Sequence, residues 1–196
     1  MNLEFTAEYV VPFKTPASIY QEHLNRYLFA SRLIREKTVL DVACATGYGS
    51  NILKDKANFV IGVDVQKKVI LYAKEHYGQP NVYFLVADAT KLPFRNGVFD
   101  VIVSFETVEH LRNHFAFSYE CARMIKKAGI FICSTPNKDV TSPMTETLSN
   151  PFHVREFRAK EFLWLLRKFF IVTQVFGQCY VSHSNKRILF NLVRKY

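Results

Sequence analysis

The sequence predicts an α/β fold with a doubly wound, mostly parallel seven-stranded sheet and an antiparallel last strand. Short apolar runs alternate with stretches of helical spacing along most of the 196 residues. Runs that are short and almost continuously apolar are typical of strands buried on both faces. Alternating strands and helices require parallel pairing through right-handed crossovers, which places helices on both faces of the sheet. The last two runs are joined through Gly177 and a polar turn, as in an antiparallel hairpin.

The first element expected is a helix over Ala17 to Ile34, where tyrosines and leucines recur at helical spacing. Strands are expected over Thr38 to Val42, Phe59 to Val63, Val82 to Val86, Val101 to Phe105, Ile130 to Ser134, Ile171 to Phe176 and Ile188 to Val193. Between the strands, apolar stripes predict one helix around Val69 to Tyr77 and another from Val108 to Ile125. An irregular stretch, Pro136 to Phe157, precedes a further expected helix over Ala159 to Phe170.

Length and composition indicate one domain over residues 1–196 with a single core. Residues 1–36 are expected to form a helical lid segment, and residues 136–157 a lid or acceptor loop. No run approaches the roughly 18 apolar residues of a membrane span, and no secretory or transit peptide is evident, so a cytoplasmic location is expected. The four cysteines form no C-x-x-C pair, which argues against a zinc knuckle or a disulfide framework.

The chain is basic, with 26 Lys and Arg against 17 Asp and Glu and a formal net charge of +9. Such an excess favours an anionic partner. The basic residues occur as scattered pairs, however, so solvated helix faces are the favoured explanation. Nucleic acid is a partner that the charge allows but does not favour, because no array of stacking aromatics beside a basic groove is evident.

Small and polar residues stand at the expected carboxyl ends of the first three strands, where ligands bind in open parallel sheets. The first strand ends in a tight turn from Asp41 to Gly49, where the backbone can approach a ligand closely. Asp64 follows the second strand, and a carboxylate there suits a pair of ribose hydroxyls. Asp88, followed by Ala89, ends the third strand and can accept from an exocyclic amine such as that of adenine. Because G-x-G-x-x-G and P-loop motifs are absent, we expect a nucleoside ligand without a pyrophosphate.

These residues resemble the class I S-adenosylmethionine-dependent methyltransferases over nearly the whole chain. The family's first motif, an acidic residue followed by alternating glycines, is matched from Asp41 to Gly47, with alanines in place of two glycines. The extra methyl group of Ala45 would narrow the approach to the amino-acid end of the cofactor. The resemblance implies S-adenosylmethionine as cofactor and the following cofactor-binding residues: Asp41, Ala43, Ala45, Gly47, Asp64, Val65, Asp88, Ala89 and Phe105.

A second group of polar residues follows the fourth strand. In an α-helical turn Glu106, Glu109 and His110 would share one face, because residues three and four apart are neighbours. His153 lies in the irregular stretch that is expected to cover the same mouth. Two carboxylates and two imidazoles suit a cation such as Mg²⁺ or Mn²⁺ that accepts mixed oxygen and nitrogen ligands.

The same pattern resembles ubiquinone-type O-methyltransferases and the enzymes that 2′-O-methylate small-RNA 3′ ends, which place a divalent metal on such a cluster. The resemblance implies Glu106, Glu109, His110 and His153 as metal ligands. Alternatively, Glu106 and Glu109 cap or solvate the helix, and His110 alone serves as a base or substrate contact. The catalytic residues that we expect are His110, Glu109 and His153.

Together these features predict an S-adenosylmethionine-dependent methyltransferase that O-methylates a small-molecule acceptor, such as a sugar or an isoprenoid-like molecule. One alternative is 2′-O-methylation of RNA 3′ ends, which the net charge and the basic residues Arg155, Arg158 and Lys160 favour. Another is a non-catalytic protein that uses the methyltransferase fold for protein contacts.

Overall fold

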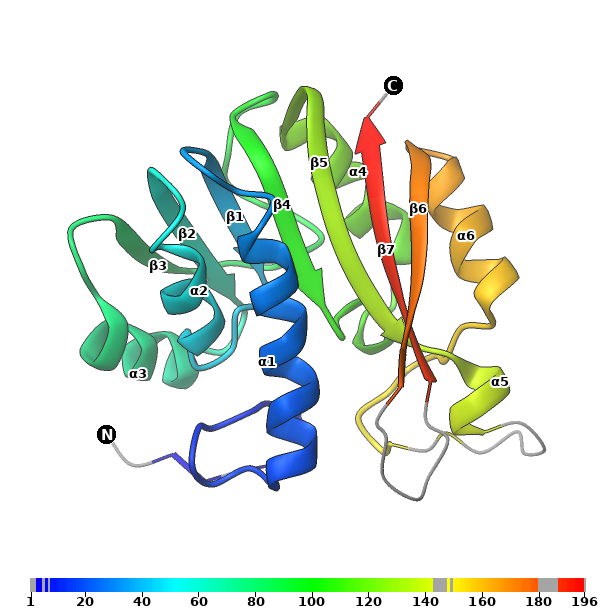
Figure 1. Ribbon diagram of the computed structural model, residues 1–196, viewed down its shortest axis with the longest axis horizontal. Coiled ribbons are helices and arrows are strands. Elements are labelled where there is room, and N and C mark those ends of the chain that lie inside the picture. The colour runs from blue at the N-terminus through cyan, green and yellow to red at the C-terminus, as the bar shows by residue number, and fades with distance from the viewer. Residues whose placement is uncertain are drawn as a thin grey trace.

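The computed structural model describes residues 3, 4, 6, 8–142, 148, 150–179 and 187–195, with side chains up to Gln178. In this part of the chain seven strands form one sheet, in the order β3-β2-β1-β4-β5-β7-β6 (Figure 1). The strands are β1 (Thr38–Val42), β2 (Phe59–Asp64), β3 (Val82–Val86), β4 (Phe99–Phe105), β5 (Ile125–Pro136), β6 (Phe170–Cys179) and β7 (Arg187–Lys195). Parallel pairing joins β3, β2, β1, β4 and β5 in that order across the sheet, whereas β7 is antiparallel to both of its neighbours. The predicted fold, with its antiparallel last strand, is therefore confirmed.

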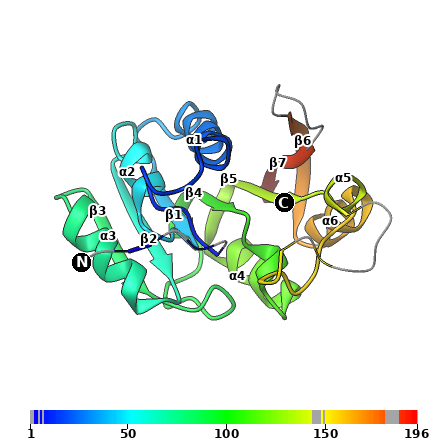
Figure 2. The same cartoon turned by 90° about the horizontal axis from the view of Figure 1, so that it is seen from below.

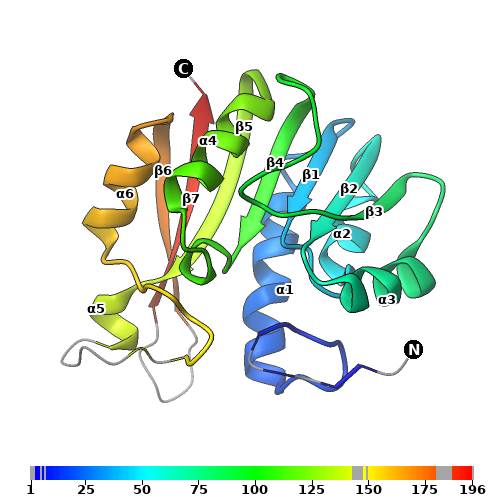
Figure 3. The ribbon, with the colours of Figure 1, turned by 180° about the vertical axis from the view of Figure 1, so that it is seen from behind.

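The sheet is the middle layer of three. The helices of the described ranges are α1 (Ala17–Ser31), α2 (Tyr48–Leu53), α3 (Lys67–Tyr77), η1 (a 3₁₀ turn, Val108–His110), α4 (His114–Met124), α5 (Lys138–Thr141) and α6 (Ala159–Arg167). Helices α1 and α2 cover one face, and α4 and α6 cover the other (Figures 2 and 3). Because successive strand residues point to opposite faces, Val39 of β1 joins the cluster that contains Ala30, and Leu40 joins the cluster that contains Phe117.

Aromatic side chains fill the core beneath α4 and α6. The ring of Phe131 on β5 lies 5.1 Å from that of Phe170 on β6 and 6.2 Å from that of Phe117 on α4. Burying one such side chain stabilises the fold by about 2–3 kcal/mol, so the contact between Phe117 and Phe131 helps to hold α4 against the sheet. Cys44, Cys121 and Cys133 are buried and free, while the side chain of Cys179 lies outside the described ones.

The stretch expected as one helix from Val108 to Ile125 consists of three elements, which corrects the prediction. The 3₁₀ turn comes first, and α4 begins only after Asn113, whose side chain accepts a hydrogen bond from the backbone N–H of Ala116. Asn113 therefore acts as an N-cap and sets the start of α4. Ile125 is not helical because it pairs with Phe99 as the first residue of β5.

Two other helices are shorter than expected. Helix α1 ends at Ser31, and α6 ends at Arg167, because Phe170 already pairs with Lys195 as part of β6. Between β5 and α6 the expected irregular stretch contains the short helix α5. Within the described ranges, no helix has the length and apolarity needed to cross a bilayer.

Parts of the two segments expected as lids lie beside the carboxyl ends of the parallel strands. At the N-terminus, the carbonyl oxygen of Val10 accepts a hydrogen bond from Oγ1 of Thr46 at 2.8 Å. Before α6, the backbone N–H groups of Val154 and Arg155 donate to the carbonyl oxygen of Glu109 at 2.8 and 3.1 Å. Residues 1, 2, 5, 7, 143–147 and 149 of these segments lie outside the described residues.

Candidate active site

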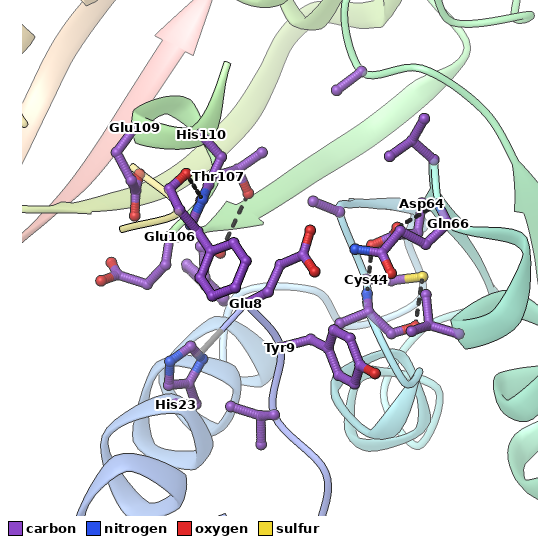
Figure 4. A pocket seen from close by; sticks show the side chains of 18 of the residues that line it. Glu8, Tyr9, His23, Cys44, Asp64, Gln66, Glu106, Thr107, Glu109 and His110 are labelled. Carbon is purple, nitrogen blue, oxygen red and sulfur yellow. Dashed lines mark hydrogen bonds between the residues drawn. The ribbon is translucent and has the colours of Figure 1, made fainter. Parts of the chain in front are cut away.

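A cavity of about 640 Å³ opens where the carboxyl ends of β1, β2, β3 and β4 meet. Its wall also includes residues of α1 such as His23 and N-terminal residues near Tyr9 (Figure 4). Asn150, Phe152 and His153 complete the wall. Ligands of open α/β sheets bind at this edge, and the volume is that of a typical small-molecule site. The wall contains seven of the residues expected to bind the cofactor: Ala43, Ala45, Asp64, Val65, Asp88, Ala89 and Phe105.

Asp41 and Gly47, the other two residues expected to bind the cofactor, are not among the described residues that line the cavity. The buried carboxylate of Asp41 accepts hydrogen bonds from Oγ of Ser50 at 2.6 Å and from the hydroxyl of Tyr27 at 3.1 Å. It thereby joins β1 to α2 and α1, and burial raises the pKa of Asp41 to about 7. Gly47 has a φ of +83°, and a Cβ there would lie 2.6 Å from the Cβ of Ala73, so this position favours glycine for backbone and packing reasons.

The turn between β1 and α2 presents mainly backbone to the cavity. Ala43 and Ala45 have φ values of +60° and +48°, in the left-handed region that costs a non-glycine residue roughly 1–2 kcal/mol. The backbone N–H of Ala45 donates to Oδ2 of Asp64 at 3.1 Å, which helps to hold the turn in this conformation. A ligand that approaches this turn therefore meets the small residues Ala43, Cys44 and Ala45.

Two oriented carboxylates lie at the ends of β2 and β3. Asp64 also accepts from the backbone N–H of Gln66, at 2.9 Å, and burial raises its pKa. Asp88 is exposed, and its Oδ1 accepts from both the N–H and the hydroxyl of Thr90 at 2.7 Å. Figure 4 shows Asp64 across the cavity from Glu106. Asp64 thus faces the cavity at the end opposite the acidic residue that follows β4, and β3, after which Asp88 comes, lies one strand further from β4.

The α-helical turn predicted from Glu106 does not form, which changes the direction of this side chain. Glu106 has a φ of +51°, and the 3₁₀ turn begins only at Val108. Oε1 of Glu106 accepts from Oγ of Ser134 at 2.6 Å, and its Oε2 lies 3.8 Å from Nη2 of Arg26. Among the described residues, Glu106 is therefore not part of the group whose geometry suits a metal ion.

Glu109, His110 and His153 come together at this end of the cavity. One ligand atom of each lies within 4.8 Å of those of the other two, and the histidine rings meet edge to face at 4.9 Å. Nδ1 of His110 lies 3.0 Å from the carbonyl oxygen of Phe152, and Nδ1 of His153 lies 3.0 Å from Oε1 of Glu156. Because both oxygens act as acceptors, Nδ1 carries the proton in each neutral ring and Nε2 keeps its lone pair.

Glu109 supplies a buried carboxyl group beside these imidazoles. Its Oε2 accepts from Oγ1 of Thr135 at 3.0 Å, whereas its Oε1 has no hydrogen-bond partner in the described part of the chain. Burial, followed by the negative charge of Glu106, raises the pKa of Glu109 well above its usual range. Burial lowers the pKa of His110. The three side chains can hold a divalent cation or act as an acid and base group.

The cavity wall is acidic. Among the described residues that line it, Arg26 is the only lysine or arginine, whereas six are acidic: Glu8, Glu22, Asp64, Asp88, Glu106 and Glu109. Such a wall attracts a ligand with positive charge.

Sequence reasoning missed Arg26, His23 and Tyr48, which also line the cavity. Arg26 is a charged residue among the buried residues of α1, next to Tyr27, and His23 lies about one helical turn before Tyr27. A charged residue at a helix position that is expected to be buried can indicate a functional role. An isolated helix carries no information about which strand ends it will cover, so the signal alone did not identify cavity residues.

Comparisons with known proteins show a likeness to methyltransferases. Residues 40–133 match the family described as a methyltransferase domain. A relative in Mycolicibacterium smegmatis, named as an S-adenosylmethionine-dependent methyltransferase, is 32% identical over 165 residues, or 84% of this chain and 63% of the relative. The domain match and this relative support a class I S-adenosylmethionine-dependent methyltransferase. A ubiquinone biosynthesis O-methyltransferase of Agrobacterium fabrum is 30% identical over 119 residues, or 60% of this chain and 48% of that relative. The chain thus spans between 48% and 63% of the length of these two curated relatives.

Solved structures share the fold at low sequence identity. An S-adenosylmethionine-dependent methyltransferase from Mesorhizobium loti aligns with a TM-score of 0.72 and 15% identity, over 87% of this chain and 98% of the other. The [4+2]-cyclase SpnF aligns with a TM-score of 0.77 and 16% identity, over 95% of this chain and 85% of the other. Because a cyclase has the same fold, the reaction must be argued from the residues of the site.

Proposed function

We propose that this protein transfers the methyl group of S-adenosylmethionine to a hydroxyl group of a small-molecule acceptor, such as a sugar or an isoprenoid-like molecule. The observation that carries the proposal is the cluster of Glu109, His110 and His153 at one end of the cavity, with Asp64 and Asp88 at the other. The likeness to a ubiquinone biosynthesis O-methyltransferase supports a hydroxyl acceptor. The acidic cavity wall argues against a phosphate-rich RNA end as the acceptor.

The strand ends fit the methyl donor. The sulfonium and ammonium groups of S-adenosylmethionine are positively charged, so the acidic wall attracts them. Asp64 would hold the ribose hydroxyls, Asp88 and Ala89 the adenine, and the turn at Ala43 and Ala45 the amino-acid end. When bound, the cofactor supplies a methyl group that the sulfonium already activates. The protein must then align the acceptor and remove its proton.

The histidine cluster supplies the group that removes this proton. Nε2 of His110 has a free lone pair when the ring is neutral, and the lowered pKa of His110 keeps the ring neutral at pH 7. His153 lies against His110 and is oriented in turn by Glu156. Glu109, His110 and His153 would also be the residues that hold Mg²⁺ or Mn²⁺, which would lower the pKa of the acceptor hydroxyl.

The experiment is methyl transfer from radiolabelled S-adenosylmethionine to pools of small hydroxyl compounds, with and without EDTA. A histidine base predicts full activity in EDTA, loss of activity in His110→Ala and nearly normal activity in His153→Ala. A metal site predicts loss of activity in EDTA and partial recovery of His153→Ala with excess Mn²⁺, because a higher metal concentration offsets lost affinity.

His76→Ala serves as the matched control, because His76 is exposed on α3 and its Nδ1 contacts the carbonyl oxygen of Tyr72. This variant should retain full activity. A labelled product that carries its new methyl group on carbon or nitrogen would contradict the proposed hydroxyl acceptor, although the protein would still be a methyltransferase.

A further inference from the structure

Arg26 and Tyr48 carry unused hydrogen-bond donors in the cavity wall. The two residues are 2% and 6% exposed, and both line the cavity. Nη1 and Nη2 of Arg26 and the hydroxyl of Tyr48 have no hydrogen-bond partner among the described residues. Buried polar groups in folded proteins are almost always paired, so this cluster of unpaired donors calls for a ligand.

The contacts of Arg26 orient its guanidinium group without using these donors. Its Nε donates to Oε1 of Gln178 at 2.9 Å, and Nε2 of Gln178 donates to the carbonyl oxygen of Glu22 at 2.9 Å. Oε2 of Glu106 lies 3.8 Å from Nη2, which allows charge attraction but exceeds hydrogen-bond length. The side chain is therefore held between α1 and β6 with its two terminal nitrogens available.

Tyr48 shares the surroundings of Arg26. Burial raises the pKa of Tyr48, so its hydroxyl keeps the proton and can donate it in a hydrogen bond. Both side chains line the cavity, and the ring of Tyr48 packs against that of Tyr27, the residue next to Arg26 on α1. The rings of Tyr20 and Tyr27, at 5.7 and 5.5 Å, hold the ring of Tyr48 in place.

The charge of the wall restricts where a negative group of a ligand can lie. Arg26 is the only lysine or arginine of the described lining residues, and the acidic residues of the wall repel an anion elsewhere. A guanidinium binds a carboxylate or a phosphate through two parallel N–H donors, and a neighbouring hydroxyl adds a third. The unpaired atoms of Arg26 and Tyr48 match this requirement.

We propose that Arg26 and Tyr48 form an anion subsite that binds one carboxylate or phosphate group of a ligand. The inference rests on the proposed function in one respect, because the ligand is taken to be the methyl donor or its acceptor. The anion comes from one of two sources, which are the α-carboxylate of the donor or an acidic group of the acceptor.

Calorimetric titration with two nucleosides tests the first source. S-adenosylhomocysteine has the α-carboxylate, and 5′-methylthioadenosine lacks the amino-acid portion. If the donor supplies the anion, Arg26→Gln should weaken S-adenosylhomocysteine binding by about 10- to 100-fold, and Tyr48→Phe by about 3- to 10-fold. Both variants should bind 5′-methylthioadenosine within about twofold of the unmutated protein, because the remaining contacts are unchanged.

Inorganic phosphate tests the second source. If the acceptor supplies the anion, Arg26→Gln leaves S-adenosylhomocysteine binding unchanged. Phosphate should then raise the Tm of the unmutated protein saturated with S-adenosylhomocysteine, and this rise should disappear in Arg26→Gln. Tyr48→Phe should reduce the rise while keeping the ring contacts that stabilise the fold.

Two further variants separate binding from structure. Arg32→Gln removes the same charge from an exposed position at the end of α1 and should change none of these measurements. Gln178→Ala removes the partner of Nε but leaves Nη1 and Nη2 in the cavity, so it should have a much smaller effect than Arg26→Gln. The proposal is overturned if Gln178→Ala reproduces the full effect, if both nucleosides lose affinity equally, or if no ligand responds to Arg26→Gln. Each of these outcomes leaves methyl transfer to a hydroxyl group as a separate question.

Discussion

Replacing Asp41 by asparagine separates a structural role from the cofactor contact that the sequence motif predicts. The side chain of Asp41 is fully buried and accepts hydrogen bonds from Ser50 and Tyr27. Asparagine has the same shape but no charge. We therefore expect Asp41→Asn to change how stability depends on pH and to change cofactor affinity little.

The size of the effect follows from the raised pKa of Asp41. In the folded protein this pKa is about 7, against the ordinary aspartate value of 3.8, and the difference corresponds to about 4 kcal/mol. Because the folded state binds the proton more tightly, this contribution is fully present below pH 3.8 and is lost as the pH rises through 7. An asparagine side chain does not titrate, so the Asp41→Asn variant does not lose this stability as the pH rises. Between pH 5 and pH 8 the unfolding free energy of the variant should therefore gain about 2–3 kcal/mol relative to the unmutated protein.

The assay is urea unfolding of both proteins at several pH values, followed by circular dichroism. Using the difference between the two proteins cancels the titration of the other buried groups. Titration with S-adenosylhomocysteine at pH 8 supplies the second measurement. A constant difference in stability across this pH range, or a loss of affinity as large as that of Asp64→Asn, would refute the structural role of Asp41.

Three further predictions concern the cofactor end, the packing of α2 and the lid. S-adenosylhomocysteine should bind in the micromolar range, and Asp64→Ala should cost roughly 1–3 kcal/mol of binding free energy in a calorimetric titration, so unchanged affinity would contradict the ribose contact. Gly49→Ala should lower the unfolding free energy by roughly 1–3 kcal/mol in urea, because its Cβ would lie 2.0 Å from the ring of Tyr27, and a variant of normal stability would disprove this packing. Saturating S-adenosylhomocysteine and acceptor should slow amide hydrogen exchange over residues 150–155, and unchanged exchange would count against closure of this segment over the acceptor.

The strands could be located from the sequence because the parallel strands are buried on both faces. In β1 the residues from Val39 to Val42 are all buried, so the strand is an almost continuous apolar run. The carboxyl ends of parallel strands meet at one edge of the sheet, so Asp64 and Asp88 could be assigned to one cavity from their positions alone. Periodicity was less informative after β4, where the N-cap Asn113 and the pairing of Ile125 in β5 divide an apparently continuous stripe.

The tertiary structure decided the directions and partners of the polar side chains. Asp41 has the motif position of a cofactor residue, but Ser50 and Tyr27 take its carboxylate. Glu106 has the spacing of a metal ligand, but it turns to Ser134 on β5.

The sequence by itself determined the fold, the edge of the sheet that holds the cavity, and the family resemblance of the strand ends. Only the tertiary structure placed Nη1 and Nη2 of Arg26 in the cavity without a hydrogen-bond partner among the described residues, while Nε bonds to Gln178, 152 positions further along the chain. The physical reason is that strand and helix formation depend on periodic burial, which local sequence records, whereas hydrogen-bond partners distant in sequence are set by packing.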